Sequence, residues 1–346
     1  MQMKTLFLVA IAFLLLSVMQ CEDNPVAPAQ PGRRDYVWTA DTLQIPYGDV
    51  FYPFRMWGSA ANDVWLVGSG SPSMFWHFDG TKWSHMTAYD GVTDPTALFG
   101  FASNDIWLAG RNEFWKYDGA KWNRFRTVSP PAGFDITSIQ DLWGSSPSDV
   151  WGVGFADQLS GGTDYEGIIM HFDGGQWQFM PIPDLRVSFV YIRQHSSNLL
   201  FLEGWYATNL DTFRVYSFNR KDSLREIYSS TDVMTISQIG DEIYFVSQQA
   251  VYEYVNGKLT LWRDFADASF GAAAGRSESD ILGYITNDDF SLWRIAHFNG
   301  SDIEVLYTIP NGFRPNGISV LFNGDFFLSC SSISSNQCIV VHGQLP

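Results

Sequence analysis

The sequence predicts an all-β protein, a seven-bladed β-propeller of four-stranded antiparallel blades. Two blocks of sequence recur with a spacing of 42 to 44 residues, and short apolar stretches separated by turn signals lie between them. No segment shows sustained helical periodicity. Four short strands repeated at this spacing are typical of a propeller, in which each repeat forms one blade.

The first block is clearest in three copies that share the pattern Asp-[Val/Ile]-Trp. These copies are Met56–Gly68, Leu98–Gly110 and Leu142–Gly154. Their aspartates, Asp63, Asp105 and Asp149, set the repeat length. Polar residues directly before each aspartate break one pair of predicted strands, so the block marks the turn between the first and second strands of a unit.

The second block follows each copy of the first and has the pattern [Phe/Tyr]-Asp-Gly-x-x-Trp. Its copies are 77–83, 116–122 and 171–177. Asp-Gly is a strong hairpin signal because glycine accepts the positive φ that a tight turn requires. Four weaker units continue the phase, with first blocks near Ser197, Gly240, Ser279 and Asn323. The total is seven units.

The two ends of the chain predict how the ring closes. The seventh unit reaches Pro346 after only three predicted strands, and Tyr36–Asp41 matches the fourth strand seen at Lys82–Met86. We therefore expect the N-terminal strand to complete the last blade, which removes two open sheet edges.

The repeats resemble bacterial tandem-repeat propellers of the BNR/sialidase-like and photosystem-assembly-factor-like class. The resemblance covers Tyr36 to the C-terminus and rests on both blocks in the first three units. The second block looks like a degenerate Asp-box, because its Asp and Gly are adjacent and the preceding Ser is missing. The resemblance implies the propeller fold and leaves the activity open.

The N-terminus has the features of a targeting segment. Lys4 precedes an apolar run, Leu6–Leu16, that is too short to span a bilayer. The segment resembles a bacterial lipobox, which implies a lipid on Cys21; the alternative is a simple secreted protein with a stray cysteine. The predicted domains are a signal peptide (1–20), a lipid-anchored flexible tether (21–35) and the propeller (36–346). The expected location is the bacterial cell envelope.

Charge excludes some partners. The chain has 21 Lys and Arg against 37 Asp and Glu, a formal net charge of -16. Nucleic acid is excluded because phosphate binding requires a basic patch. Anionic headgroups would repel the chain, so membrane contact is expected only through the lipid anchor. No metal site or cofactor is predicted; Ca²⁺ is the one ion that the acidity leaves open. We expect a monomer.

Two cysteines remain for the propeller. Cys330 and Cys338 flank a predicted turn, and in an oxidising envelope they are candidates for a disulfide across a hairpin. The alternative is a pair of buried free thiols.

Residues that recur in many units are expected to serve the fold. The four histidines at the position of His77 are spread around a ring, so they are expected to be structural rather than a metal site. The recurring tryptophans are expected to pack between sheets. The recurring aspartates are expected to bond to nearby backbone amides in turns.

Function is expected where the repeat is broken. One face of the propeller carries the regular Asp turns, and we call it the turn face. The opposite face, the loop face, carries variable loops, which commonly hold recognition residues. Its ligand-binding candidates are Asp164, Tyr165, Glu166, Trp205 and Tyr206.

Three hypotheses of function remain. The first is a non-enzymatic binding or assembly propeller for a protein or a glycan. The second is a carbohydrate-active enzyme, a hydrolase or lyase; sialidase chemistry requires an arginine cluster, a Tyr and acids, and Arg55, Arg193 and Arg314 are the arginines near inner strands. The third is a surface protein without a specific ligand. No catalytic motif stands out, so no catalytic residue is named.

Overall fold

A computed structural model describes residues 31–45, 50–71, 75–86, 94–159, 165–206, 212–247, 250–265, 270–287 and 289–346. Pro31–Pro346 form one compact unit. Its described residues are strands joined by turns and loops, without a helix. None of them therefore belongs to a helix that could cross a bilayer. The predicted signal peptide and Cys21 lie outside the described residues.

Four sheets are four-stranded antiparallel meanders in chain order. Sheet 1 is β2 (Val50–Ala60), β3 (Asp63–Ser71), β4 (Phe75–Phe78) and β5 (Trp83–Met86). Sheet 2 is β6 (Ala97–Ala102), β7 (Asp105–Ala109), β8 (Glu113–Tyr117) and β9 (Trp122–Thr127). Sheet 3 is β10 (Ile136–Ser146), β11 (Asp149–Asp157), β12 (Glu166–Phe172) and β13 (Trp177–Phe179). Sheet 4 is β14 (Val187–Ser196), β15 (Leu199–Tyr206), β16 (Phe213–Phe218) and β17 (Leu224–Ser230).

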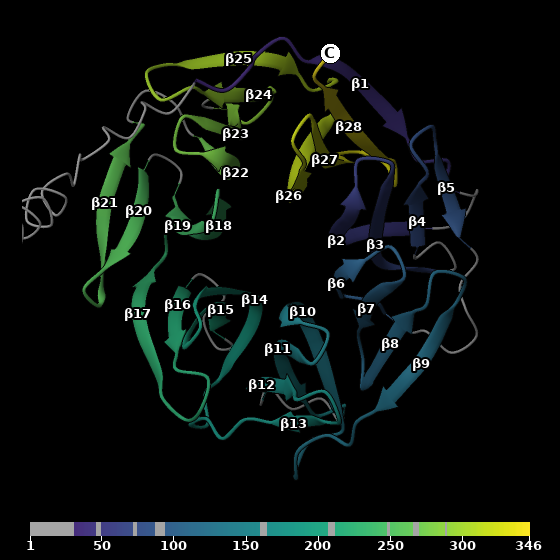
Figure 1. Cartoon of the computed structure of the whole chain (residues 1–346), viewed down its shortest axis with the longest axis vertical. Helices are drawn as coiled ribbons and strands as arrows, with labels where there is room; N and C mark the ends of the chain where they lie inside the picture. The colour runs from purple at the N-terminus through teal and green to yellow at the C-terminus, as the bar shows by residue number, and fades with distance from the viewer. Residues whose placement is uncertain are drawn as a thin grey trace, which may run out of the picture. The chain divides into compact units, whose positions relative to one another are not determined.

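The remaining strands form two more sheets. The eight-stranded sheet contains β18 (Thr235–Ile239), β19 (Glu242–Val246), β20 (Ala250–Val255), β21 (Lys258–Asp264), β22 (Gly271–Ser277), β23 (Asp280–Thr286), β24 (Trp293–Phe298) and β25 (Ile303–Thr308). The closing sheet contains β26 (Phe313–Leu321), β27 (Asp325–Ser332), β28 (Cys338–Gln344) and β1 (Val37–Thr42). The sheets surround a central axis, with the first strand of each meander innermost, and β26 packs beside β2 (Figure 1).

The prediction of seven separate blades is wrong. The structure has five four-stranded sheets, and the other two predicted units are joined in the eight-stranded sheet. The junction is a parallel pairing of β18 with β22, in which Ile239 lies opposite Gly275. The Gly240 N–H donates to the Gly275 carbonyl oxygen at 2.9 Å. These two units therefore share a backbone hydrogen bond.

The side chain between neighbouring inner strands explains this junction. A Cβ added at Gly275 would lie 2.9 Å from Ile239 Cγ2. The equivalent glycines of sheets 2 and 3 face aromatic rings instead: Gly100 meets Trp57, and Gly144 meets Phe101. Because isoleucine is smaller than an aromatic residue, β18 and β22 can approach within hydrogen-bond distance. The number of sequence repeats does not predict this junction.

The predicted closure of the ring is confirmed. β1 pairs with β28 along six residues, from Val37 opposite Gln344 to Thr42 opposite Ile339. Trp38 stacks on Tyr307, with ring centroids 5.4 Å apart. The last sheet is thus completed by a strand from the other end of the chain, as Figure 1 shows beside the C-terminus.

The chain before β1 is also held in place. The Gly32 N–H donates to the Ser279 carbonyl oxygen at 2.8 Å. Arg34 Nη1 pairs with Glu304 at 2.9 Å, and Arg34 Nε bonds to His297 Nδ1 at 3.1 Å. Residues 31–35, the end of the predicted tether, therefore lie against the eight-stranded sheet at the turn face.

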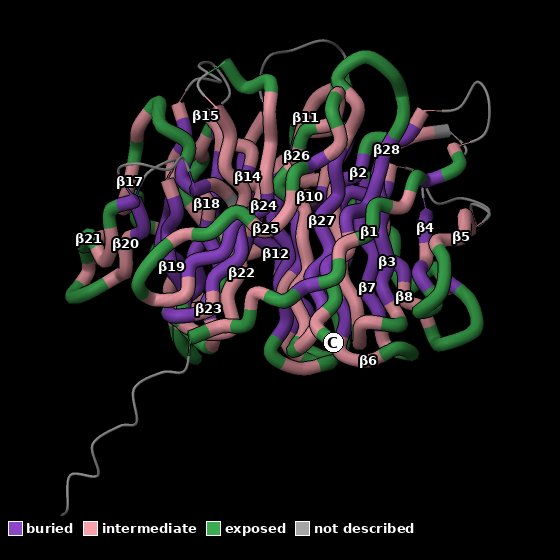
Figure 2. The backbone as a smooth tube through the Cα atoms, turned by 90° about the horizontal axis from the view of Figure 1, so that it is seen from above, coloured by how far each residue is buried: buried purple, intermediate pink, exposed green. Residues whose placement is uncertain are grey.

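The recurring residues hold the sheets together as predicted. Trp65 of sheet 1 packs edge-on against Trp122 of sheet 2, with centroids 5.7 Å apart. Trp107 of sheet 2 packs in the same way against Trp177 of sheet 3, at 5.6 Å. Buried residues accordingly occupy the middle of the sheets, and exposed residues lie at the two faces and on outer strands (Figure 2).

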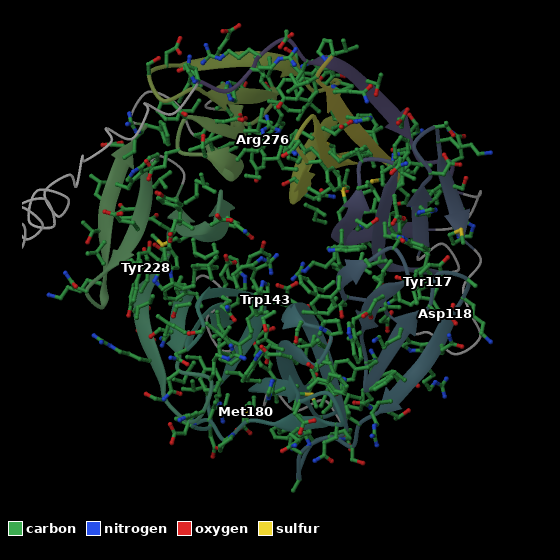
Figure 3. The ribbon with its side chains drawn as sticks, in the orientation of Figure 1. Tyr117, Asp118, Trp143, Met180, Tyr228 and Arg276 are labelled. Atoms are coloured by element: carbon green, nitrogen blue, oxygen red, sulfur yellow. The ribbon has the colours of Figure 1, made fainter. Side chains whose placement is uncertain are left out.

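The recurring polar residues work within a sheet. His77 Nε2 lies 2.7 Å from Asp63 Oδ1, and the same pair recurs in three other units at 2.7 to 3.0 Å. At the turn, Asp118 accepts hydrogen bonds from two backbone amides at 2.9 Å, and Gly119 supplies the positive φ of 92° (Figure 3). The amide bonds predicted for the Asp118 series are confirmed, whereas the prediction is wrong for Asp63, which bonds to the side chains of His77 and Ser59.

The predicted disulfide is absent. Cys330 and Cys338 are buried free thiols. In the register of β27 and β28, Cys330 lies opposite Ile339, whereas Cys338 lies opposite Ser331. This one-residue offset directs the two side chains to opposite faces of the closing sheet, where they join different core clusters.

Candidate functional site: a cavity beside the ring axis

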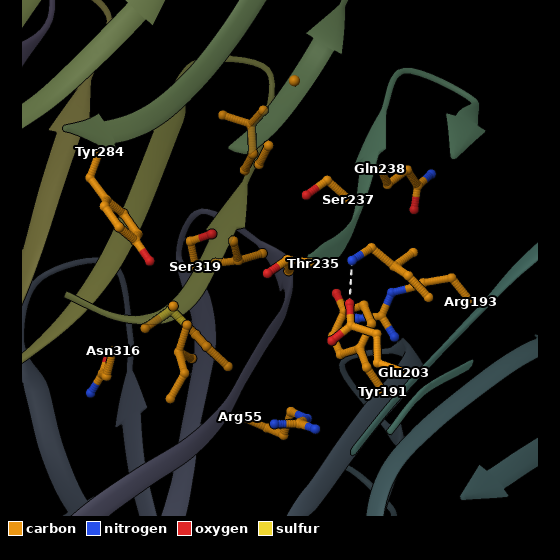
Figure 4. Close-up of a pocket in the computed structure, with 18 of the residues that line it drawn as sticks. Arg55, Tyr191, Arg193, Glu203, Thr235, Ser237, Gln238, Tyr284, Asn316 and Ser319 are labelled. Carbon is orange, nitrogen blue, oxygen red and sulfur yellow. Dashed lines mark hydrogen bonds between the residues drawn. The ribbon is translucent and has the colours of Figure 1, made fainter. Parts of the chain in front are cut away.

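A cavity of about 770 Å³ lies among the inner strands. It is lined by β2, β14, β18, β22 and β26, with contributions from β15 and β23 (Figure 4). Most of its wall therefore comes from the units whose repeat is weakest. Uncharged polar side chains face the cavity, among them Thr235, Ser237, Gln238, Asn316 and Ser319. The volume is in the range of sites for small ligands or short segments.

Three of the inner strands contain a β-bulge at the same position. β2, β10 and β14 each contain a register shift, directly before Arg55, Asp141 and Tyr191 respectively. A β-bulge of this kind adds one residue to a strand and redirects the side chains that follow. The three residues consequently occupy equivalent positions in sheets 1, 3 and 4 and converge near the axis.

Arg55 and Asp141 connect sheets across the axis. Asp141 is only 1% exposed. Its Oδ1 accepts from Arg55 Nε at 2.8 Å. Arg55 Nη1 donates to the Phe54 carbonyl oxygen at 2.7 Å, and Arg55 Nη2 donates to the Val190 carbonyl oxygen. Every nitrogen of the Arg55 guanidinium thus has an acceptor in the protein.

Arg193 shares the same carboxylate but is less fully bonded. Its Nη1 donates to Asp141 Oδ2 at 2.8 Å and to the Ile192 carbonyl oxygen at 2.5 Å. Its guanidinium stacks on the Tyr191 ring, 3.7 Å from the centroid. Its Nε and Nη2 have no acceptor among the described residues. Burial raises the pKa of Tyr191, so its phenol is a poor nucleophile.

Glu203 lies beside Arg193 in the cavity wall (Figure 4). Its side chain accepts a hydrogen bond from the Ile236 N–H, and the residue is 6% exposed. Burial raises the pKa of Glu203 to about 8, against the lowering effects of that hydrogen bond and of Arg193 and Arg55. Glu203 is therefore mostly neutral at pH 7.

Glu203 also breaks the repeat. Glu203 lies opposite Tyr191 in the strand register of sheet 4. The residue at the same position is Val67 in sheet 1, opposite Arg55, and Val153 in sheet 3, opposite Asp141. The equivalent residue of sheet 2 is Ala109. An acid at a position that is otherwise apolar and buried is a signal present in the sequence. It lies within a strand, however, and not in the variable loops where binding residues were expected.

Of the predicted ligand-binding residues, Tyr165, Glu166 and Trp205 have described side chains, and none of these three lines the cavity. Tyr165 packs on Phe155, with centroids 5.5 Å apart, and Glu166 begins β12. Burial and a hydrogen bond with Asp184 raise the pKa of Glu166. Asp164 lies outside the described residues. A binding role for this loop stays a prediction.

Trp205 and Tyr206 are strand residues rather than loop residues. They are the last two residues of β15, and Trp205 lies opposite Phe213. The Trp205 ring packs edge-on against Phe213 with centroids 5.3 Å apart, so it is partly buried. The Tyr206 side chain is outside the described part. The prediction of an irregular loop here is wrong, because the strand continues past the end of the repeat pattern.

The arginines named from the sequence divide between the cavity and the surface. Arg55 and Arg193 line the cavity, whereas Arg314 is exposed at the start of β26. Arg276 also lines the cavity, and it bonds to Asp280 at 2.7 Å and to the Tyr36 hydroxyl. Within the described ranges, no group of three or more His, Cys, Asp or Glu is arranged to hold a metal ion.

Solved structures share this architecture. The chain has the β-propeller fold. YCF48 bound to D1 peptide matches with a TM-score of 0.59 and 12% identity, covering 92% of this chain and 100% of that one. YCF48 from Cyanidioschyzon merolae matches with a TM-score of 0.60 and 13% identity, covering 88% and 98%.

A third solved structure matches nearly as well as the two YCF48 structures. The structure of streptogramin B lyase has a TM-score of 0.57 and 15% identity, covering 88% of this chain and 97% of that one. At such low identities the likeness extends to the fold alone. No protein-family model matches the chain, and no curated protein sequence does either.

Proposed function

We propose that the protein is a non-enzymatic binding propeller, and that a segment of a protein partner enters the cavity beside the axis. The observation that carries this proposal is the cavity itself, which opens among the least regular units and is lined by polar groups. A rigid ring of repeats supplies the scaffold, and the departures from the repeat supply the recognition surface.

A peptide suits this cavity better than a glycan. Its uncharged polar side chains match the alternating donors and acceptors of a polypeptide. Sugar binding favours an open aromatic face, and the face of Tyr191 is covered by Arg193. A propeller of the same fold, YCF48, has been solved with a peptide bound.

The enzymatic alternative has one observation in its favour. Two arginines, a tyrosine and a glutamate gather at one wall of the cavity. Arg55, however, is held by an acceptor of the protein at each of its three guanidinium nitrogens, and the raised pKa of Tyr191 disfavours its phenolate. These features support binding over turnover.

Selection from a random peptide library tests the proposal. Selected peptides should bind the wild type and the outer-strand control Thr260→Trp equally, because Thr260 is exposed on β21. They should bind Ser319→Trp at least about tenfold more weakly, because an indole there fills the cavity. Equal binding to all three proteins would contradict the proposal. A glycan array and a turnover assay on the same glycans test the two alternatives.

The cellular address is a second part of the proposal. A lipid on Cys21 would hold the propeller at the bacterial envelope, and the support for it is the apolar run followed by cysteine. Mass spectrometry of the mature N-terminus should show a diacylglyceryl-modified Cys21, and Cys21→Ala should be released or left unprocessed. A mature chain with an unmodified N-terminus elsewhere would contradict the anchor.

A further inference from the structure

Arg55 and Arg193 differ in how many of their guanidinium nitrogens have an acceptor in the protein. Arg55 uses Nε, Nη1 and Nη2 for acceptors within the protein. Arg193 uses only Nη1. Its Nε and Nη2, which lie on one edge of the guanidinium, have no acceptor among the described residues. The Arg193 side chain remains 20% exposed and lines the cavity. One bidentate fork is therefore available to a bound molecule.

Glu203 adds a third donor next to this fork. One of its oxygens accepts from the Ile236 N–H, and the other, Oε2, has no partner in the described part of the chain. Because the acid is mostly neutral at pH 7, its hydroxyl proton can be donated into the cavity. The charged or titratable groups facing it are Arg55, Arg193, Asp141 and Tyr191.

The charge at this wall is unbalanced by one unit. Two guanidinium groups share the single carboxylate of Asp141, and the neutral Glu203 adds nothing. Asp141 is 1% exposed and cannot take a further cation from the cavity side. The surplus is one positive charge in a partly desolvated site, where one bound anion is favoured.

We propose that the cavity binds a carboxylate of the partner segment, held by the Nε and Nη2 donors of Arg193 and by the carboxyl group of Glu203. This inference rests on the proposed function and names the chemical group of the partner that the cavity recognises. A planar fork fits a planar carboxylate with two parallel hydrogen bonds. A single surplus charge balances one carboxylate but not a phosphate dianion.

The protonated acid makes this subsite selective with respect to pH. A carboxylate that approaches neutral Glu203 accepts a hydrogen bond, whereas one that approaches ionised Glu203 meets a like charge. Ionisation also cancels the surplus positive charge. Binding therefore weakens as pH rises past 8, while Glu203→Gln, which keeps a donor and never ionises, escapes this loss.

Three small probes separate the sources of the carboxylate. N-acetylalanine mimics a chain terminus, N-acetylaspartic acid α-amide mimics an acidic side chain, and N-acetylalanine amide has no carboxylate. Calorimetric titration into the mature full-length protein at pH 7 should show binding of at least one acid and at least about tenfold weaker binding of the amide. Preference for N-acetylalanine assigns the site to a C-terminus, and equal binding assigns it to either source.

Matched variants locate the binding. Arg193→Lys keeps a charge for Asp141 but loses the fork, so the acid should bind at least about tenfold more weakly. Arg314→Gln removes an arginine that is exposed on β26, outside the cavity, and should leave binding unchanged. Melting temperatures establish that each variant is folded. Between pH 7 and pH 9 the wild type should lose about tenfold in affinity, and Glu203→Gln should lose less than about twofold.

The outcomes separate this inference from the proposed function. If neither acid binds more tightly than the amide, or if Arg193→Lys folds and binds like the wild type, the carboxylate subsite is wrong. An equal loss of affinity at pH 9 in the wild type and in Glu203→Gln would remove Glu203 from it. Library peptides that still bind the wild type and fail on Ser319→Trp would then support a peptide-binding cavity without a carboxylate subsite.

Discussion

Sheets 3 and 4 are neighbours built on the same plan, and they use the same positions for different purposes. In sheet 3, Asp149 bonds to His171 at 2.7 Å, and the histidine stacks on Trp151 with centroids 4.1 Å apart. In sheet 4 the register places Phe201 opposite Ser217 at the positions of that Trp and His. Sheet 4 has lost the polar brace and places Glu203 in the cavity wall.

A contact with sheet 3 partly replaces the Asp–His hydrogen bond that sheet 4 lacks. Arg220 of sheet 4 reaches back to Asp149 of sheet 3 and contacts both carboxylate oxygens, at 2.6 and 2.7 Å. One aspartate therefore stabilises two sheets. Positions that repeat maintain the ring, and a unit freed from them can carry residues for binding.

The largest expected effect concerns the closing sheet. Deleting residues 36–43 removes the six-residue pairing of β1 with β28 and the packing of Trp38. We expect the free energy of unfolding to fall by about 5 kcal/mol or more, because ladder hydrogen bonds and core contacts are lost together. Urea denaturation measures the loss. Unchanged stability would show that the ring does not depend on this strand.

The next effect tests the positions that repeat. Trp107 is fully buried, and Trp107→Ala should cost about 3–5 kcal/mol. The matched change at a position outside the repeat is Trp205→Ala, which should cost less because that ring is only partly buried. Equal losses in urea denaturation would erase the distinction between the two kinds of position.

The stability of Glu203→Gln as a function of pH tests the buried acid of sheet 4. The raised pKa of about 8, against 4.5 for an ordinary glutamate, means that the folded protein holds a proton which the unfolded chain releases. Wild-type stability therefore falls relative to the variant as pH rises from about 4.5 to about 8, and the difference is constant above that. Thermal melts between pH 4 and 9 should show it; parallel curves would contradict a buried neutral acid.

A pH series on Asp149→Asn gives the opposite sign in sheet 3. Although burial alone raises it, hydrogen bonds from Ser145, Arg220 and His171 hold the pKa of Asp149 at about 2. This stabilisation is present above the ordinary pKa of 3.8 and is lost as pH falls through 2. The variant should be less stable by about 1–2 kcal/mol at pH 6, allowing for solvent screening, and the gap should close towards pH 2.

The features of the fold that could be predicted from the sequence are those that recur from unit to unit or complete the repeat. The turns at Asp63 and Asp118, the packing of Trp107 and the closure by Trp38 were predictable because each recurs or completes a pattern. The cavity was not, because Arg55, Asp141 and Arg193 come from three different sheets and meet only when bulges redirect the inner strands.

Two failures have simple geometric causes. Cys330 and Cys338 are symmetric about their turn, but a register offset of one residue reverses the face on which a side chain lies. Seven sequence units did not give seven sheets, because Ile239 stands where neighbouring sheets insert an aromatic ring. Neither feature is visible without the pairing of strands.

The hydrogen bond from Gly240 to Gly275 also bears on how the ring comes apart. Among the other described sheets, sheets 2 and 3 are joined in a similar way, because the Asn112 N–H donates to the Thr137 carbonyl oxygen at 3.0 Å and the Ile139 N–H donates to the Gly110 carbonyl oxygen at 3.2 Å. β18 and β22 cannot part without breaking a main-chain bond, and the two halves of the eight-stranded sheet should open as one cooperative unit in hydrogen exchange. The same two strands form one wall of the cavity, so this wall should open only when both halves of the eight-stranded sheet open together.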